Sequence, residues 1–154
     1  MKGNETVIFT LNERLVMEWT GIQQYLIHRA TLAVWEYPKL LEYLEERITD
    51  EQRHYNMLAE RIRFLEGQPF YGTMNPVSIG QDILTMYAND LATELDAVQK
   101  YNETIQICLQ AGDSGTRGII ESILSDEEDH SRDLQAQLTQ IAQMSVENYL
   151  SSKL

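Results

Sequence analysis

Two histidines in this sequence each follow a glutamate at a distance of three residues. Glu51 and His54 belong to the segment DEQRH, and Glu127 and His130 belong to DEEDH, 76 positions later. A spacing of three places the glutamate and the histidine on the same face of a helix. Carboxylate oxygens combined with a few imidazole nitrogens favour iron or manganese over a metal that prefers thiolates. The two motifs therefore predict metal binding.

The same shift of 76 positions aligns a second pair of segments. MEWTGIQQY falls on TELDAVQKY, which pairs Glu18 with Glu94 and Tyr25 with Tyr101. In both halves, 33 residues separate this first glutamate from the glutamate of the histidine motif. An internal repeat of this kind predicts two helical hairpins related by a pseudo-two-fold axis. Four carboxylates and two imidazoles from the two hairpins would suit a pair of metal ions.

Four long segments with helical hydrophobic periodicity are expected to carry these residues. In each segment the glutamate of interest lies on the apolar seam, 12 or 13 residues from the start, so all four carboxylates reach a similar depth in the core. An isolated buried carboxylate is costly, and it must be paired, protonated or bound to a cation. The expected helices span about 6–34, 38–65, 81–110 and 115–143, and Ser145 is expected to cap a short fifth helix at 146–152.

The connections between these segments indicate an all-α, four-helix bundle in a single domain, 1–154. The first and third connections are short and predict antiparallel hairpins. The link 66–80 has about 15 residues and reaches roughly 50 Å when extended, whereas a 28-residue helix is about 42 Å long. The link is therefore long enough to cross the whole bundle, which would make the second and third helices parallel. A loop that joins neighbouring helix ends is the less favoured alternative.

The composition limits the class of protein. The chain has 154 residues, of which 43% are hydrophobic, and it carries 12 basic and 24 acidic residues for a formal charge of −12. Such a charge should repel nucleic acid and anionic membranes and attract cations, although an acidic surface can also serve solubility alone. No segment approaches the ~20 apolar residues of a membrane span. The N-terminus lacks the apolar run of a secretory signal, and the lone Cys108 fits a cytoplasmic location.

A purely structural polar core is the main alternative to a metal site. Glutamate accounts for 16 of the 154 residues, so a given histidine has roughly a one-in-ten chance of following a glutamate at this spacing. Two of the three histidines do so, and they occupy matching positions in the repeat. The doubled motif therefore favours the metal site strongly.

Other polar residues near the motifs leave two interpretations open. Tyr25 and Tyr101 lie two helical turns beyond their glutamates, where each could hydrogen-bond a ligand carboxylate and one could donate an electron; core packing is the alternative. The functional interpretation is favoured for Tyr25, and Tyr101 is left open. Asp50 and Asp126 are either solvated acids or, for Asp50, a guide for iron. His28 is expected to be structural.

These residues resemble the bacterioferritins over nearly the whole chain. The resemblance includes the start MKGNETVI, the segment LAERIRFLEGQP after the first motif, NDLATELDAV around Glu94, and the end QMSVENYL. It implies a ferritin-like four-helix bundle with a long crossover and a short C-terminal helix, assembled into a hollow 24-subunit shell. It also implies a di-iron site with bridging Glu51 and Glu127, terminal Glu18 and Glu94, ligands His54 and His130, and Tyr25 as a redox tyrosine.

One position departs from the family pattern. The family binds haem b between two subunits through paired methionines that directly follow the first bridging glutamate, and this chain has Gln52 there. Glutamine is a poor ligand for haem iron compared with a thioether. The sequence therefore predicts that a homo-oligomer lacks haem, unless a companion subunit supplies the methionine.

The resemblance implies iron storage and detoxification by a ferroxidase. The protein would oxidise Fe(II) to Fe(III) with O2 or H2O2 and keep the product inside the shell. Two alternatives remain at this point. One is a di-iron oxidase or peroxidase that stores no iron, and the other is a structural subunit of a mixed shell.

Overall fold

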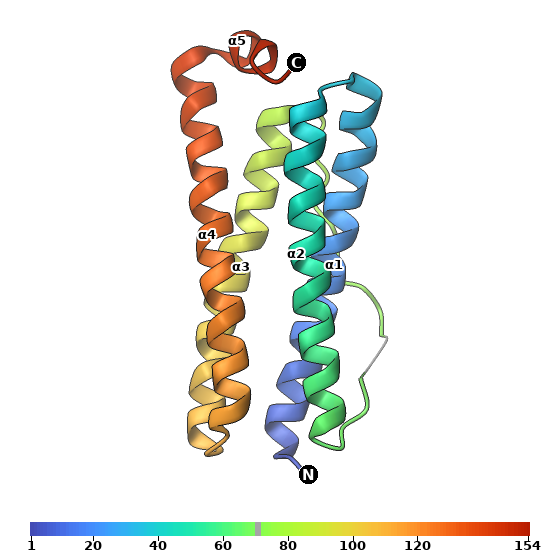
Figure 1. Cartoon of the computed structure of the whole chain (residues 1–154), viewed down its shortest axis with the longest axis vertical. Helices are drawn as coiled ribbons and strands as arrows, with labels where there is room; N and C mark the ends of the chain where they lie inside the picture. The colour runs from blue at the N-terminus through green and yellow to red at the C-terminus, as the bar shows by residue number, and fades with distance from the viewer. Residues whose placement is uncertain (70–71) are drawn as a thin grey trace.

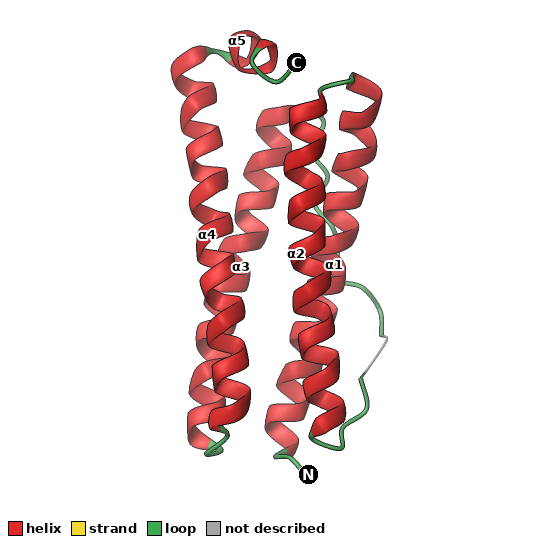
Figure 2. Cartoon of the chain, viewed as in Figure 1, coloured by secondary structure: helices red, strands yellow, loops and turns green. Residues whose placement is uncertain are grey.

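We describe a computed structural model of the chain, which covers residues 1–69 and 72–154. The described residues form helices and loops without any strand (Figure 2). Four long helices are followed by a short one: α1 (Glu5–Trp35), α2 (Pro38–Phe64), α3 (Ile83–Gln110), α4 (Ser114–Met144) and α5 (Val146–Ser151). The predicted all-α bundle with a short fifth helix is confirmed.

The four long helices form two antiparallel hairpins, α1 with α2 and α3 with α4 (Figure 1). Helices α2 and α3 run in the same direction, because the link between them returns along α1 from one end of the bundle to the other (Figure 1). Residues 70 and 71 of this link lie outside the described residues. The long crossover is confirmed, and the alternative of a loop that joins neighbouring helix ends is wrong.

Hydrogen bonds attach the crossover to α1. Three backbone N–H groups of the link donate to side chains that follow one another on one face of α1. The pairs are Asn75 with Thr20, Ser78 with Gln24 and Gly80 with His28, each at a donor–acceptor distance of 3.0 Å. The link has no regular secondary structure here, so these side chains satisfy donors that would otherwise lack partners. These hydrogen bonds hold residues 75–80 of the link, the crossover strap, along α1.

Side-chain caps set the ends of the helices. The Asp82 side chain accepts from the Thr85 N–H over 2.8 Å, and the Asp82 N–H donates to the Thr85 hydroxyl over 3.2 Å, which forms a capping box. Helix α3 therefore begins at Ile83, and the expected start at residue 81 is wrong. The other helix ends lie within one residue of those expected. Between α3 and α4, Gly112 adopts a left-handed φ of 68°, which suits glycine, and Asp113 caps α4.

The apolar core is divided into two clusters by a polar layer. One cluster contains Leu11 and Leu15 of α1 with Leu58 and Ile62 of α2. The other contains residues near the opposite end of the bundle, among them Leu32, Leu40, Leu44, Leu134 and Ile141. On every long helix, the glutamate predicted to bind metal lies between the segments that build the two clusters. Apolar packing above and below thus holds the polar layer in place. None of the described helices combines the length and apolar content that crossing a membrane requires.

Candidate metal centre

The six predicted ligands converge in the middle of the bundle, one or two from each long helix. Their side chains are buried, with exposed fractions between 0% and 5%. They form two overlapping groups, in each of which one ligand atom per residue lies within 4.8 Å of the others: Glu18, Glu51, His54 and Glu127, and Glu51, Glu94, Glu127 and His130. Glu51 and Glu127 belong to both groups.

The two shared glutamates each face both histidines. In Glu51, Oε1 lies 3.2 Å from Nδ1 of His130, and Oε2 lies 3.8 Å from Nδ1 of His54. In Glu127, Oε1 lies 3.0 Å from Nδ1 of His54, and Oε2 lies 3.1 Å from Nδ1 of His130. Each of these carboxylates therefore presents one oxygen to each group.

The two remaining glutamates divide their oxygens differently. The Tyr101 hydroxyl donates to Oε1 of Glu18, and the Tyr25 hydroxyl donates to Oε1 of Glu94. The other oxygen of each carboxylate faces the site: Oε2 of Glu18 lies 3.8 Å from Nδ1 of His54, and Oε2 of Glu94 lies 3.5 Å from Nδ1 of His130. Each tyrosine thus binds the glutamate on the opposite helix of the α1–α3 pair, which the sequence did not specify.

Several polar atoms at this site have no hydrogen-bond partner among the described residues. They are Oε2 of Glu18, Oε1 of Glu51, Oε1 of Glu127 and Nδ1 of His54. Nδ1 of His54 does lie 3.0 Å from Oε1 of Glu127, but this contact lacks hydrogen-bond geometry. Leaving buried polar atoms unpaired costs about 1–3 kcal/mol each. Their convergence fits cations at the centre, since carboxylate oxygens and imidazole nitrogens are the donors that such ions bind.

Burial and mutual repulsion disfavour the charged form of these carboxylates. Burial, followed by repulsion from Glu18, raises the pKa of Glu51 to about 8. Burial, followed by repulsion from Glu51, raises the pKa of Glu94 to about 7, and the same two causes raise the pKa of Glu127. Burial alone would lower the pKa of His54, but the surrounding carboxylates of Glu127, Glu18 and Glu51 raise it above its ordinary value. The cluster therefore needs added positive charge, from protons or from metal ions.

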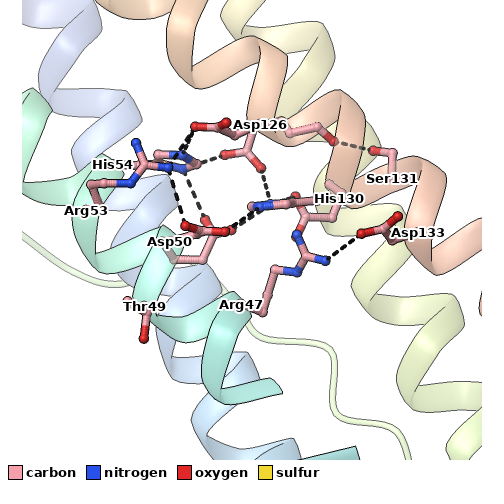
Figure 3. Close-up of polar contacts among 12 residues, drawn as sticks. Arg47, Thr49, Asp50, Arg53, His54, Asp126, His130, Ser131 and Asp133 are labelled. Atoms are coloured by element: carbon pink, nitrogen blue, oxygen red, sulfur yellow. Dashed lines mark hydrogen bonds and ion pairs between the residues drawn. The ribbon is translucent and has the colours of Figure 1, made fainter. Parts of the chain in front are cut away.

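On each of the two histidines, the nitrogen that points away from the glutamates contacts one aspartate. Nε2 of His54 lies 3.0 Å from Oδ2 of Asp126, and Nε2 of His130 lies 3.3 Å from Oδ2 of Asp50 (Figure 3). Arg53 joins the pair, since its Nη2 lies 2.8 Å from Asp126 and 3.4 Å from Asp50. A carboxylate on Nε2 favours the tautomer that leaves Nδ1 free to bind a metal. The interpretation of both aspartates as merely solvated acids is wrong.

An acidic pocket of about 250 Å³ opens between α2 and α4 beside the site. His130 is the one predicted ligand in its lining. The remaining lining consists of five carboxylates, one guanidinium and one phenol: Glu46, Asp50, Asp126, Asp129, Asp133, Arg47 and Tyr43. The excess of carboxylates makes this face attractive to cations.

His28 lies away from the cluster, in a structural role. Its Nδ1 lies 3.0 Å from Oδ1 of Asp90, and its Nε2 accepts from the N–H of Gly80. Gln24 also donates to Asp90 over 2.8 Å. This buried network joins α1, α3 and the crossover. Sequence analysis missed Asp90 and Gln24, because neither residue type recurs after the shift of 76 positions: Gln24 falls on Lys100, and Asp90 falls on Arg14.

Known proteins resemble the chain over almost its entire length. A family model described as a ferritin-like domain matches residues 8–144. The bacterioferritin of Brucella melitensis is 36% identical over 149 residues, which cover 97% of this chain and 92% of that protein. The bacterioferritin of Streptomyces coelicolor is 34% identical over 152 residues, covering 99% and 91%. The bacterial ferritin of Synechocystis is 33% identical over 155 residues, covering 100% and 99%.

The fold, the buried carboxylate and histidine cluster and these matches agree. The predicted resemblance is confirmed, because both the family model and the relatives extend over the helices that carry the cluster. The chain belongs to the bacterioferritins, within the ferritin-like proteins.

Proposed function

We propose that this protein stores iron and is a ferroxidase, with two Fe(II) ions as its substrate at the buried cluster. The observation that carries the proposal is the pair of overlapping ligand groups that share Glu51 and Glu127. Their oxygens point to different groups, so these two carboxylates would bridge the ions. Glu18 with His54 and Glu94 with His130 would complete the two metal positions.

Charge balance supports two divalent ions. Four ionised carboxylates carry four negative charges, which two Fe(II) ions would neutralise in this buried site. Oxidation to Fe(III) adds two positive charges, and the fixed carboxylates attract Fe(III) more strongly than Fe(II). The neutral histidines bind through Nδ1 while Asp126 and Asp50 accept from their Nε2–H groups. The protein therefore lowers the cost of oxidation mainly through charge and fixed ligand geometry.

The proposed oxidation balances with either oxidant. With the two Fe(II) as the sole electron donors, O2 takes up two electrons and two protons and gives H2O2. With H2O2 as the oxidant, the same two electrons and two protons give two water molecules. Tyr25 would act as a redox tyrosine, since its hydroxyl donates to Glu94 and the side chain is 1% exposed.

Entry of Fe(II) would use the acidic pocket between α2 and α4. Asp50 lies in the pocket lining and contacts His130, so it would guide the ion from the surface to the cluster. The product Fe(III) would move into the cavity of a 24-subunit homo-oligomeric shell. The support for this shell is membership in the bacterioferritins, and the same membership and the lone Cys108 support a cytoplasmic location.

This chain lacks the methionine that binds haem in the family pattern. Gln52 is exposed on α2 and offers an amide in place of a thioether. The nearby Met57 is already contacted by Arg53, whose Nη1 lies 3.7 Å from its sulfur. The proposed reaction therefore includes no haem step. Haem in an assembled shell would require a companion subunit with a methionine at this position.

Iron loading under air distinguishes storage from the alternatives. The purified oligomer should elute with the mass of 24 chains of 17.8 kDa each, oxidise two Fe(II) per subunit in a fast phase, and then load further iron into filled shells. Fast oxidation without further loading would support a non-storing di-iron oxidase or peroxidase instead. A shell that neither oxidises nor binds Fe(II) would support a structural subunit of a mixed shell.

A further inference from the structure

The pseudo-two-fold symmetry of the site extends to its two tyrosines. Tyr25 on α1 and Tyr101 on α3 are 76 positions apart, as are the paired ligands. Both side chains are buried, with exposed fractions of 1% and 0%. Each hydroxyl donates to one oxygen of a glutamate whose other oxygen faces the ligand group. The contacts that connect Tyr25 to the site are thus repeated for Tyr101.

We propose that Tyr101 is a second redox-active phenol, equivalent to Tyr25, and that the site holds four one-electron donors for O2. This inference rests on the proposed ferroxidase function and extends it. A buried phenol gives up an electron readily only if its proton leaves with it. In Tyr101, the acceptor for this proton is Oε1 of Glu18, to which the hydroxyl already donates. Tyr25 has the same arrangement with Oε1 of Glu94.

Four donors match the demand of complete O2 reduction. Two Fe(II) and two phenols supply four electrons, the phenols supply two protons, and two more protons come from solvent. The products are two water molecules, two Fe(III) and two neutral tyrosyl radicals. Two further Fe(II) and two protons then return the radicals to phenols. The complete cycle consumes four Fe(II) per O2 and releases no H2O2.

Among the described residues, the two other buried tyrosines, Tyr87 and Tyr149, lack this arrangement. The Tyr149 hydroxyl lies 3.3 Å from the Tyr87 hydroxyl and also donates to the amide oxygen of Gln137. Neither phenol of this pair donates to a carboxylate of the cluster. A Tyr149→Phe variant is therefore a matched control that removes one buried phenol without changing the proposed donors.

Freeze-quench electron paramagnetic resonance tests the proposal. Wild-type protein and the variants Tyr25→Phe, Tyr101→Phe, Tyr149→Phe and the Tyr25→Phe/Tyr101→Phe double variant are loaded anaerobically with two Fe(II) per subunit and mixed with O2. We expect a tyrosyl radical in each single variant and none in the double variant. A peroxide assay should detect about one H2O2 per O2 consumed in the double variant and none in wild type.

Several outcomes would overturn the inference. Loss of all radical signal in Tyr25→Phe would show that Tyr101 donates no electron, as would normal iron oxidation by wild type without any radical. Cobalt(II) titration of Tyr101→Phe provides a readout that does not depend on turnover. Binding of two ions per subunit is expected, whereas loss of Co(II) binding would assign Tyr101 a purely structural role. Absence of Fe(II) binding in wild type would instead refute the ferroxidase proposal itself.

Discussion

His54 on α2 and Asp126 on α4 face each other across the bundle, with 3.0 Å between the imidazole Nε2 and the carboxylate Oδ2. His130 on α4 and Asp50 on α2 repeat this relationship with the helices exchanged, over 3.3 Å. Each hairpin therefore orients the histidine of the other. Because the contact fixes which nitrogen faces the glutamates, the two halves of the site depend on each other.

Removal of Asp126 should weaken metal binding without removing a direct ligand. We expect Asp126→Ala to lower the affinity for Co(II) by about 10- to 100-fold, because the His54 ring loses the acceptor that fixes its tautomer and orientation. Calorimetric titration measures this affinity. Glu128→Ala is the matched control, since Glu128 is an exposed carboxylate on the same helix and does not line the acidic pocket. Equal affinities in the two variants would contradict the positioning role.

The stability of the metal-free protein should fall as the pH rises from about 5 to 8. The pKa values of Glu51 and Glu94 are raised by burial to about 8 and about 7, above the ordinary value of 4.5. The folded state thus binds protons that the unfolded state has already released in this range, and stability decreases as these carboxylates ionise. The raised pKa of His54 acts in the same direction.

Bound divalent ions should remove this dependence, because they replace the protons as the neutralising charge. Thermal unfolding of metal-free and Zn(II)-loaded protein at several pH values measures both effects. We expect the increase in Tm on loading to be larger at pH 8 than at pH 6. An increase that is larger at the lower pH would contradict the proposed charge balance.

The crossover strap should depend on His28. The His28→Leu change removes the acceptor of the Gly80 N–H and a donor to the buried Asp90. We expect the free energy of unfolding to fall by about 2–4 kcal/mol, since the buried Asp90 keeps only Gln24 as a donor and the Gly80 N–H loses its acceptor. Chemical denaturation measures the change. Thr31→Ala, whose hydroxyl bonds only the backbone of its own helix among the described contacts, is the control. Unchanged stability in His28→Leu would contradict the claim that His28 holds the crossover along α1.

Gln52 should prevent the homo-oligomer from binding haem through two methionine sulfurs, because this position offers an amide. Haem added to the wild-type protein should therefore not show the spectrum of iron with two thioether ligands. Absorption and magnetic circular dichroism spectra of the reconstituted protein test this expectation. A paired-thioether spectrum in the wild-type homo-oligomer would show that another methionine of this chain supplies the ligand.

The residues of the buried cluster could be predicted from the sequence, because the repeat marks them. Glu18 and Glu94 lie on apolar seams at matching positions, and His54 and His130 repeat the spacing of three. Because a buried carboxylate must be paired, protonated or bound to a cation, their predicted burial indicated a metal site. The crossover was predictable to the extent that length permits it, but the hydrogen bonds along α1 that hold it were not.

Contacts between hairpins could not be predicted from the spacing alone. Asp50 and Asp126 also recur at a distance of 76 residues, and this recurrence was the available signal for their shared role. The pairing of each with the histidine of the other hairpin depends on how α2 and α4 pack. The same holds for Tyr101. Its hydroxyl donates to Glu18 on α1, and not to Glu94, which lies on α3 in the same repeat segment as Tyr101.

The most direct test of the central claim is an anaerobic Fe(II) titration of metal-free protein. Wild-type protein should bind two Fe(II) per subunit. Glu51→Ala should lose both ions because Glu51 belongs to both ligand groups, and Glu18→Ala should lose one. Glu128→Ala, which changes an exposed neighbour of Glu127, should still bind two. No saturable binding by wild type, or unchanged binding by Glu51→Ala, would contradict the di-iron assignment.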